Sequence, residues 1–339
     1  MKRGIIFLGC ICILIFGFCM PGFAEEKKFK VEVLQVTGID PYQKSYMAFV
    51  KELENNGFVQ GKNLVINRKI IAYDVEKGGL WKKLGVLMDI KSEASRIVSA
   101  KPDLVLTIGT PATKYAKDKI VSAGIPLVFT AVAIPTAAGC KSVTEAGFGF
   151  TGSTLYMNMK DGFKIVKLAF PKIKTVGMIH SDDENGIAHV EEAKKAAPSV
   201  GMNVISKEVS KNDKLTPTLE ALQKQGAEAF AVPLDTYYGI RNYEACRELE
   251  AFSTKTKIPV FSFALMKVPG AILYVGSDFG IIGQLSGQQA VKILRDGVKP
   301  DTLPILKQEE LKILVDSKQL KALNYQLPLE ILQLAKDVE

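Results

Sequence analysis

Histidine, tryptophan and cysteine are scarce in this chain, which has 2 histidines, 1 tryptophan and 5 cysteines among 339 residues. The two histidines, His180 and His189, lie too far apart to be paired metal ligands on one turn of a helix. The sequence also lacks the serine-hydrolase elbow, the Walker phosphate loop and the HExxH pair. We therefore expect no catalytic residue, no metal and no cofactor.

His180 ends a predicted strand and precedes a polar, acidic loop at 181–185. A weak metal site is one interpretation of this loop. The simpler interpretation is a loop that caps the following helix, with its acids near the positive end of the helix dipole.

The cysteines do not form a disulfide framework. Three of the five lie in the first 19 residues, and no CxxC pair occurs in the rest, which keeps only Cys140 and Cys246. Cys246 shares the apolar face of a predicted helix with Leu249, so we expect a small buried hydrophobic residue there. A bridge between Cys140 and Cys246 is the alternative.

Basic residues outnumber acidic ones, and the formal net charge is +8. The surplus is spread along lysine-rich helix faces rather than gathered in one block, and aromatic residues do not interleave with it. This pattern is typical of a solvated surface and argues against a nucleic-acid partner.

A long apolar run occurs only at the start of the chain. Lys2 and Arg3 precede an apolar stretch at 4–20, and the small residues Gly22 and Ala24 close it. This is the pattern of a cleavable secretory signal peptide at 1–24, with cleavage after Ala24. A membrane anchor and a lipidated cysteine are the alternatives, but the run is short for a span, which needs about 20 residues.

The rest of the chain alternates short apolar runs with amphipathic helical stretches. Several of the runs are apolar throughout, as strands of a parallel sheet covered by helices on both faces are. This alternation predicts a doubly wound α/β protein. The predicted strands are 31–36, 64–70, 104–108, 127–130, 175–179, 204–209, 229–232, 260–263 and 272–275.

One unit of this pattern occurs twice. A strand ending at Thr110-Pro111 leads through a helix to an Ile-Pro strand start at 125–126, and a strand ending before Asp235 leads through a helix to another at 258–259. We expect two Rossmann-like lobes joined by crossover strands. Lobe 1 would contain 31–149 plus about 278–305, and lobe 2 would contain 150–277 plus about 306–335.

The repeat also predicts where a ligand binds. Thr110 can cap the helix that follows it, Pro111 suits the first helical turn, and Asp235 can cap the matching helix. Ligands of open parallel sheets lie at the carboxyl ends of strands, and the free N–H groups of helix starts favour anions there. Tyr237 and Tyr238 come just after the cap at Asp235, beyond Thr236, and line either the cleft or the core.

The glycine-rich stretch at 147–152 spells G-x-G-x-x-G. A dinucleotide-binding fingerprint follows a strand and opens a helix. Here the aromatic residues Phe148 and Phe150 make the stretch itself resemble a strand. We interpret it as a glycine-rich crossover between the lobes.

Six stretches stand out when they are taken in order along the chain, namely 53–63, 109–112, 126–132, 151–152, 232–235 and 277–280. Together they resemble the family of ABC transporter substrate-binding proteins that includes the tryptophan- and tyrosine-related receptors. The resemblance implies the type I periplasmic-binding fold, with a small molecule held between two lobes and passed to a membrane permease.

The resemblance also implies the ligand contacts. In an amino-acid receptor, hydroxyl and helix N–H groups would hold the carboxylate, and Asp235 would pair with the ammonium group. The chain departs from the family at Gly186, where serine is usual, at Thr236, and in the apolar stretch around Phe263. These departures favour a ligand with substantial apolar surface, against which Phe263 or Tyr237 would stack. The expected ligand-binding residues are Thr110, Pro111, Thr130, Asn185, Gly186, Asp235, Thr236, Tyr237, Phe263 and Asp278.

The sequence thus predicts an exported, monomeric receptor that delivers a small molecule, such as an aromatic or other apolar amino acid, to an ABC importer. Two alternatives share the fold. One is a small-molecule α/β enzyme acting in the cleft, which would need a nucleophile–base pair. The other is a sensory receptor that presents its closed form to a signalling partner in the membrane.

Overall fold

A computed structural model describes residues 27–72 and 80–338 of the chain. The predicted signal peptide and its cleavage site lie outside the described residues. Within the described part, no helix combines the length and the apolar character needed to cross a bilayer.

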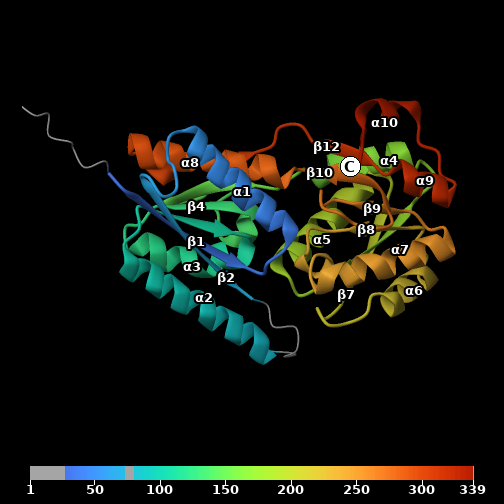
Figure 1. Cartoon of the computed structure of the whole chain (residues 1–339). Coiled ribbons are helices and arrows are strands. Elements are labelled where there is room, and N and C mark those ends of the chain that lie inside the picture. Colours follow the sequence, from blue (N-terminus) through green and yellow to red (C-terminus); the bar gives the residue numbers. More distant parts are fainter. Residues whose placement is uncertain (1–26, 73–79, 339) are drawn as a thin grey trace, which may run out of the picture.

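Two sheets lie side by side, each in its own layered lobe (Figure 1). The strand order is β11-β5-β4-β3-β1-β2 in the first sheet and β13-β12-β10-β9-β8-β6-β7 in the second. All paired strands are parallel except β10 and β12. The strands of the first sheet are β1 (Phe29–Val36), β2 (Leu64–Ile71), β3 (Leu104–Ile108), β4 (Leu127–Val132), β5 (Phe150–Thr154) and β11 (Leu306–Lys307). Those of the second are β6 (Thr175–His180), β7 (Asn203–Glu208), β8 (Ala229–Val232), β9 (Val260–Ser262), β10 (Ala271–Gly276), β12 (Lys312–Val315) and β13 (Lys336–Asp337).

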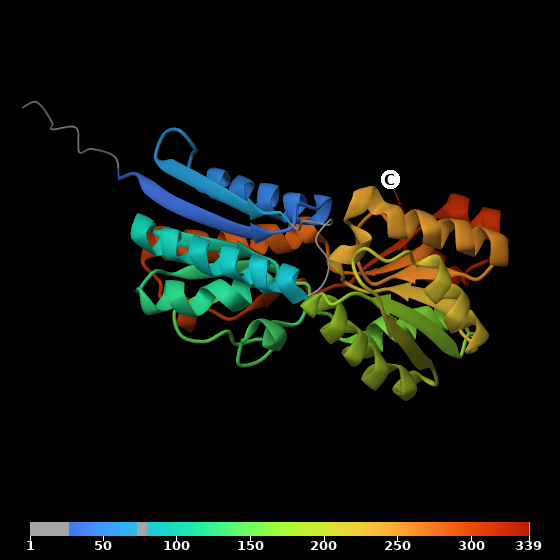
Figure 2. The ribbon, with the colours of Figure 1, turned by 90° about the horizontal axis from the view of Figure 1, so that it is seen from below.

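Helices cover both faces of each sheet, as the continuously apolar strands require (Figure 2). In the first lobe, one face carries α1 (Asp40–Asn55) and α8 (Phe279–Asp296), and the other carries α2 (Leu80–Ala100) and α3 (Thr110–Ser122). In the second lobe, one face carries α4 (Met159–Ala169), α5 (Glu184–Ala196), α9 (Ser317–Leu323) and α10 (Leu329–Leu334), and the other carries α6 (Thr216–Lys224) and α7 (Glu244–Thr256). Short 3-10 turns are η1 (Pro135–Ala138), η2 (Ala197–Val200), η3 (Thr236–Tyr238), η4 (Arg241–Tyr243) and η5 (Pro300–Thr302).

The two lobes repeat one topology. If the five main strands of each lobe are numbered along the chain, they lie side by side in the order 2-1-3-4-5. In the first sheet these strands are β2-β1-β3-β4-β5, and in the second they are β7-β6-β8-β9-β10. The strand–helix–strand unit β3-α3-β4 therefore corresponds to β8-α7-β9. This confirms the two similar lobes that the repeated sequence pattern predicted, and all nine predicted strands are present.

The chain crosses between the sheets later than predicted. Strand β5 pairs with β4, and β11 pairs with β5, so both belong to the first sheet. The phenyl ring of Phe150 packs into the core beside α3, which holds β5 in that sheet. Residues 150–152 of the glycine-rich stretch belong to this strand, in keeping with its strand-like aromatic residues, and 147–149 form a turn before it. The interpretation of the stretch as a crossover between the lobes is wrong, because β5 completes the first sheet and the chain crosses after it.

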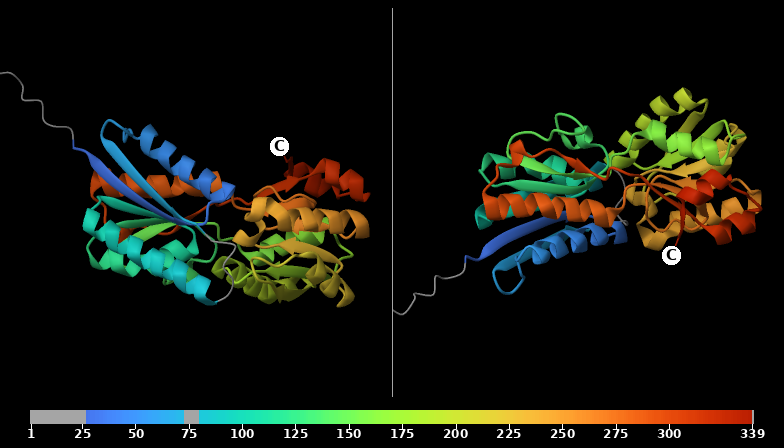
Figure 3. Two further views of the ribbon diagram at one scale, coloured as in Figure 1. Left: turned by 60° about the horizontal axis from the view of Figure 1, so that its bottom comes forward. Right: turned by 90° about the horizontal axis from the view of Figure 1, so that it is seen from above.

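Three crossovers join the lobes in the described part of the chain, at 155–158, 277–278 and 308–311 (Figure 3). Two of them are tied together, because the backbone N–H of Asp278 donates to Gln308 Oε1 at 2.8 Å. The Asp278 carboxylate also accepts from Lys44 and from Lys312, each at 2.9 Å. Lys44 lies on α1 and Lys312 on β12, so Asp278 links the two lobes at the hinge.

The two remaining cysteines are buried and free. Cys246 is fully buried under α7, where its thiol donates to the Tyr238 carbonyl oxygen at 3.2 Å. The prediction of a small buried residue is confirmed for Cys246, and the described structure contains no Cys140–Cys246 bridge.

Helices α1 and α8 approach so closely that only glycine fits at their contact. A Cβ atom on Gly283 would overlap the Ser45 carbonyl oxygen, and one on Gly287 would lie 2.6 Å from Glu52 Cβ. Ser45 further fixes the pair, because its hydroxyl donates to the Phe279 carbonyl oxygen at 2.8 Å.

We expect Gly283→Ala to lower the free energy of unfolding by about 1–3 kcal/mol, because the added methyl group forces the helices apart. Gly85→Ala is the matched control. Gly85 also lies inside a helix, α2, but nothing stands within 4 Å of its missing Cβ. That change should stabilise the protein by about 0.5–1 kcal/mol. Urea unfolding of both variants tests the pair, and equal effects would contradict the close-contact account.

Candidate functional site

The strand order of each lobe reverses at one point, between β1 and β3 in the first and between β6 and β8 in the second. Connections on the two sides of such a point leave toward opposite faces of the sheet, so a crevice opens at the carboxyl ends of the strands. Gly109 and Thr110 follow β3, while Ser181 follows β6 and Asp235 follows β8. Both switch points therefore carry polar residues, and Thr110 and Asp235 are the two that the sequence analysis placed in matching positions.

Thr110 begins α3 but does not cap it. Gly109 takes the N-cap position with φ 87°, and no side chain caps this helix. A Cβ atom on Gly109 would lie 2.7 Å from the Tyr42 hydroxyl oxygen, so both the backbone angle and the close approach require glycine. The predicted cap at Thr110 is wrong, and its hydroxyl is directed to the other lobe instead.

Asn185 is the residue where the two switch points meet. It lies in the first turn of α5, and its Oδ1 accepts from Thr110 Oγ1 and, at 3.2 Å, from the Ala133 backbone N–H. Tyr42 of α1 lines the same small space as Asn185. One buried amide of the second lobe thus bonds to the start of α3 and to the segment after β4, and lies beside α1.

Asp235 is buried beside Asn185. Its carboxylate accepts from the Ser181 N–H at 2.6 Å, the Ser181 hydroxyl at 2.8 Å and the Tyr237 N–H at 2.8 Å. Burial, with a second contribution from the nearby Asp183 carboxylate, raises the pKa of Asp235 to about 7. Asp235 caps η3 as the sequence predicted, although the structure places a short 3-10 turn there before α7 begins.

Asp183 organises the loop before α5. Its Oδ1 accepts from the Asn185 N–H at 2.9 Å, which caps the helix, and its Oδ2 accepts from the Thr236 hydroxyl at 2.6 Å. Lys211 lies 3.5 Å from the same oxygen. The prediction that this polar loop caps the next helix is confirmed, and the cap orients Asn185.

Gly186 provides room for the Asp235 carboxylate. A Cβ atom at position 186 would overlap Asp235 Oδ2. The glycine that departs from the family pattern therefore allows the carboxylate to lie against the first turn of α5, where the positive end of the helix dipole stabilises negative charge.

Tyr42, Thr110, Asn185 and Asp235 form what we call the inner cluster. The free space beside Tyr42, Asn185 and Asp235 is about 20 Å³, which is room for roughly one water molecule. Next to it lies a larger space of about 340 Å³, the outer groove. The two spaces share Tyr42 and Thr236. The outer groove is lined by Val36, Thr37, Tyr42, Leu84, Val86, Leu87, Ile90, Pro111, Tyr115, Asp182, Asp183, Glu184, Ile187, Lys211 and Thr236.

Contacts at the rim hold the lobes together around these spaces. Glu184 of α5 accepts from Lys114 at 2.7 Å and from the Tyr115 hydroxyl at 2.5 Å, both on α3. On the other side of the cleft, the Tyr243 hydroxyl donates to Asp40 at 2.6 Å. The structure is therefore a closed form.

Three predicted site residues lie elsewhere. Tyr237 is fully buried in the core beside α7, and its hydroxyl donates to the Asp213 carbonyl oxygen at 2.9 Å. Phe263 packs edge-to-face on Phe163 in the opposite core of the second lobe. Asp278 lies at the hinge with its two lysines, which contribute to lowering its pKa to about 2. The side chains of Tyr237 and Phe263 are thus core, and that of Asp278 is engaged away from the inner cluster.

Thr130 remains at the edge of the site. It lies near the end of β4, and its carbonyl oxygen accepts from the Gly109 N–H at 3.0 Å. Its buried hydroxyl has no hydrogen-bond partner among the residues that the structure describes. A buried hydroxyl without a partner is costly, and a bound ligand is one way to satisfy it.

Sequence reasoning missed Tyr42 and Ser181. Both follow the first strand of their lobe, at the same kind of strand end that identified Thr110 and Asp235. Applying that criterion to β1 and β6 as well would have found them.

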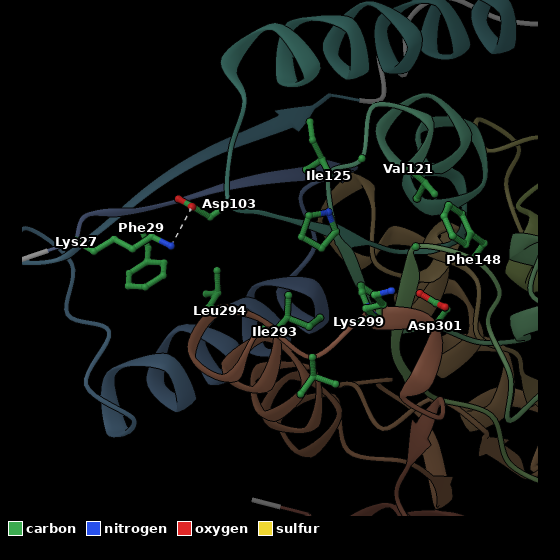
Figure 4. Close-up of a pocket in the computed structure, with 16 residues that line it drawn as sticks. Lys27, Phe29, Asp103, Val121, Ile125, Phe148, Ile293, Leu294, Lys299 and Asp301 are labelled. Carbon is green, nitrogen blue, oxygen red and sulfur yellow. Dashed lines mark ion pairs between the residues drawn. The ribbon is translucent and has the colours of Figure 1, made fainter.

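A hollow of about 390 Å³ at the other end of the first lobe contains none of the predicted site residues (Figure 4). It lies where Phe29 begins β1 and where Ile125 precedes β4, next to the end of α8 at Leu294. The Lys27–Asp103 ion pair at 4.0 Å lies at its rim. Its place at the amino ends of the strands, away from the switch point, argues against a ligand site.

Comparison with known proteins supports the interpretation of the chain as a two-lobed protein. The family model described as ABC transporter substrate binding protein matches residues 30–339. A tyrosine-binding protein of Clostridioides difficile (strain R20291) is 25% identical over 305 residues, which are 89% of this chain and 83% of that protein.

Solved structures agree on the fold. A Streptococcus pneumoniae ABC domain in complex with L-Trp has a TM-score of 0.77 at 22% identity, covering 92% of this chain and 100% of that one. A ligand-free, open structure of a Clostridium difficile substrate-binding protein with adhesive properties has a TM-score of 0.68 at 26% identity, covering 92% and 99%. The predicted type I periplasmic-binding fold is confirmed.

The raised pKa of Asp235 makes stability depend on pH. A carboxyl whose pKa is higher in the folded protein holds its proton more tightly when folded, so this group opposes folding increasingly as the pH rises from its unfolded pKa toward about 7. Asp235→Asn replaces this ionisable carboxyl group with an amide that does not titrate. As the pH rises from about 4 to about 8, the free energy of unfolding of the variant minus that of the parent should increase by at least about 2 kcal/mol.

Asp118→Asn is the control, because the Asp118 side chain is 86% exposed. Its free energy of unfolding relative to the parent should stay flat over the same range. Urea unfolding at several pH values measures both. A flat difference for Asp235→Asn as well would show that burial does not perturb this carboxyl.

Proposed function

The chain belongs to the family of ABC transporter substrate-binding proteins, and on that premise we propose that it binds an amino acid between its lobes at the inner cluster. Proteins of this family bind small molecules outside the cytoplasm and deliver them to a membrane permease.

The proposal rests on the surroundings of the Asp235 carboxylate. It is buried, it accepts three hydrogen bonds from its own lobe, and it lies next to Asn185, which reaches the other lobe. A ligand ammonium group would supply the positive charge that a buried carboxylate favours, in a charge-assisted hydrogen bond.

Groups that suit a carboxylate lie on the opposite wall. Thr110 and Thr130 carry hydroxyls, and the Thr130 hydroxyl has no partner in the closed form. The Tyr42 hydroxyl of the same lobe is a further donor, and the Asn185 amide nitrogen adds one from the lobe that carries Asp235. An amino acid between these walls would meet an acceptor at one end and donors at the other.

The relatives point to the same class of ligand. One relative is named a tyrosine-binding protein, and a structure of the same fold contains L-Trp. Tyrosine and tryptophan are therefore the first candidates to test.

We propose that the ligand leaves the protein unchanged. The Ser181 hydroxyl donates to Asp235, and neither histidine stands beside it as a base. His180 Nδ1 lies 2.9 Å from the Ser181 carbonyl oxygen. His189 is buried, its Nδ1 accepts from the Leu234 N–H at 2.9 Å, and burial lowers its pKa to about 4. Incubation with tyrosine followed by mass spectrometry should return tyrosine alone, and turnover would favour an enzyme.

The amino-acid site is tested by two substitutions. We expect Asp235→Asn to weaken binding of tyrosine or tryptophan by about 2–4 kcal/mol, because a buried charged pair is lost. Thr110→Val should cost about 1–2 kcal/mol, because only a neutral hydrogen bond is lost. Titration calorimetry measures both, with Asp118→Asn as the control. Unchanged affinity in Asp235→Asn would show that the ammonium group is not held there.

Export is the second part of the proposal. The mature chain would begin near Glu25, remain monomeric and deliver its ligand to an ABC permease. We expect N-terminal sequencing of exported protein to start near Glu25, and native mass spectrometry to give a monomer of that chain. An intact Met1 or a lipid-modified cysteine would contradict this.

A further inference from the structure

The inner cluster alone is too small for an apolar side chain. Its free space of about 20 Å³ leaves no volume for a phenyl or indole ring next to the polar groups. A ligand held by Asp235 and Thr110 must therefore extend into an adjoining space. Two grooves adjoin the cluster, one on each side of the cleft.

The outer groove adjoins the inner cluster, and Tyr42 and Thr236 line both spaces. Its volume of about 340 Å³ is in the range of small-molecule sites. The first turns of α2, which supply much of its wall, point toward the second lobe (Figure 1). The groove is therefore an interlobe space that begins at the polar cluster.

The wall of this groove is largely apolar. Leu84, Leu87 and Ile90 lie on successive turns of one face of α2, and Val36 at the end of β1 lies beside them. Ile187 of α5 faces them from the other lobe. Leu84 is 40% exposed and Ile187 is 38% exposed, so both walls present apolar surface that has no partner in this form. An apolar group between them would remove that surface from water.

The groove on the opposite side shares Pro41 and Met266 with the inner cluster and has a volume of about 740 Å³. Charged residues line both grooves, so charge does not separate them. The difference lies in exposed apolar surface. Among the described residues, Leu84 and Ile187 of the outer groove are exposed large apolar side chains, whereas no apolar side chain that lines the opposite groove is exposed to that degree.

We propose that the outer groove is the side-chain subsite of the bound amino acid, and that Leu84 and Leu87 of α2 select ligands with a large apolar or aromatic side chain. This inference rests on the proposed function, because it assumes that the inner cluster holds the α-amino and α-carboxylate groups. It moves the apolar wall from Phe263 and Tyr237, which lie in the core, to α2.

The test compares variants of one helix. The double change Leu84→Ala and Leu87→Ala shortens both side chains, and we expect it to weaken binding of tyrosine, tryptophan and phenylalanine about tenfold or more, through lost apolar contact. Met88→Ala is the matched control. Met88 lies on the same helix and is 69% exposed, and it does not line the groove. Leu265→Ala reports on the opposite groove, which Leu265 lines.

Titration calorimetry on the full exported chain, with thermal melts of the ligand-free variants, separates the outcomes. The inference is supported if only the Leu84 and Leu87 double variant loses affinity while its melting temperature stays close to that of Met88→Ala. It is overturned if Leu265→Ala alone weakens aromatic ligands, or if neither change does so while the parent binds them. If the parent binds none of these amino acids, the proposed function itself fails.

Discussion

The structure depends on a carboxylate that is buried where two lobes meet. Asp235 lies at the switch point of the second lobe, and Asn185 beside it reaches Thr110 and Ala133 of the first. A buried carboxylate is costly unless hydrogen bonds or a positive charge compensate it. Within its own lobe, Ser181 and Tyr237 provide three hydrogen bonds. An ammonium group from a ligand would complete the compensation, which couples binding to the closed arrangement.

Closure in turn follows from the repeated topology. Because both sheets have the same strand order, each lobe presents its switch point at the carboxyl edge of its strands, and the crossovers turn these edges toward each other. Asp278 holds the hinge by joining Lys44 of one lobe to Lys312 of the other. The rim contact of Glu184 with Lys114 and Tyr115 then closes the groove over α2.

The strands and the two lobes could be predicted from the sequence, because apolar runs and their turns are local patterns. The site could be predicted only in part. Thr110 and Asp235 follow strands, which the sequence shows. The cap at Gly109 could not be predicted from the helix signal alone, because its close approach to Tyr42 joins segments far apart in the chain. The family resemblance places Asp278 at the ligand, whereas its side chain bonds to Lys44 and Lys312, which are remote in sequence and which no local pattern indicates.

The direction of a side chain is the second property of the site that the sequence does not reveal. Tyr237 lies two residues after Asp235, yet the 3-10 turn that Asp235 caps directs its ring into the core beside α7. Phe263 follows β9 and packs on Phe163 instead of facing the cleft. Conversely, Leu84 and Leu87 lie on a helix far from any strand end, so only the tertiary structure places them beside Tyr42 and Pro111.

A crystal structure of the exported protein grown with tyrosine or tryptophan tests the central claim most directly. The account predicts closed lobes, with the ligand ammonium group about 3 Å from the Asp235 carboxylate, as a charge-assisted hydrogen bond requires. The ligand ring should lie against Leu87 of α2. A ligand bound elsewhere, or one whose ammonium group is held by a residue other than Asp235, would contradict it.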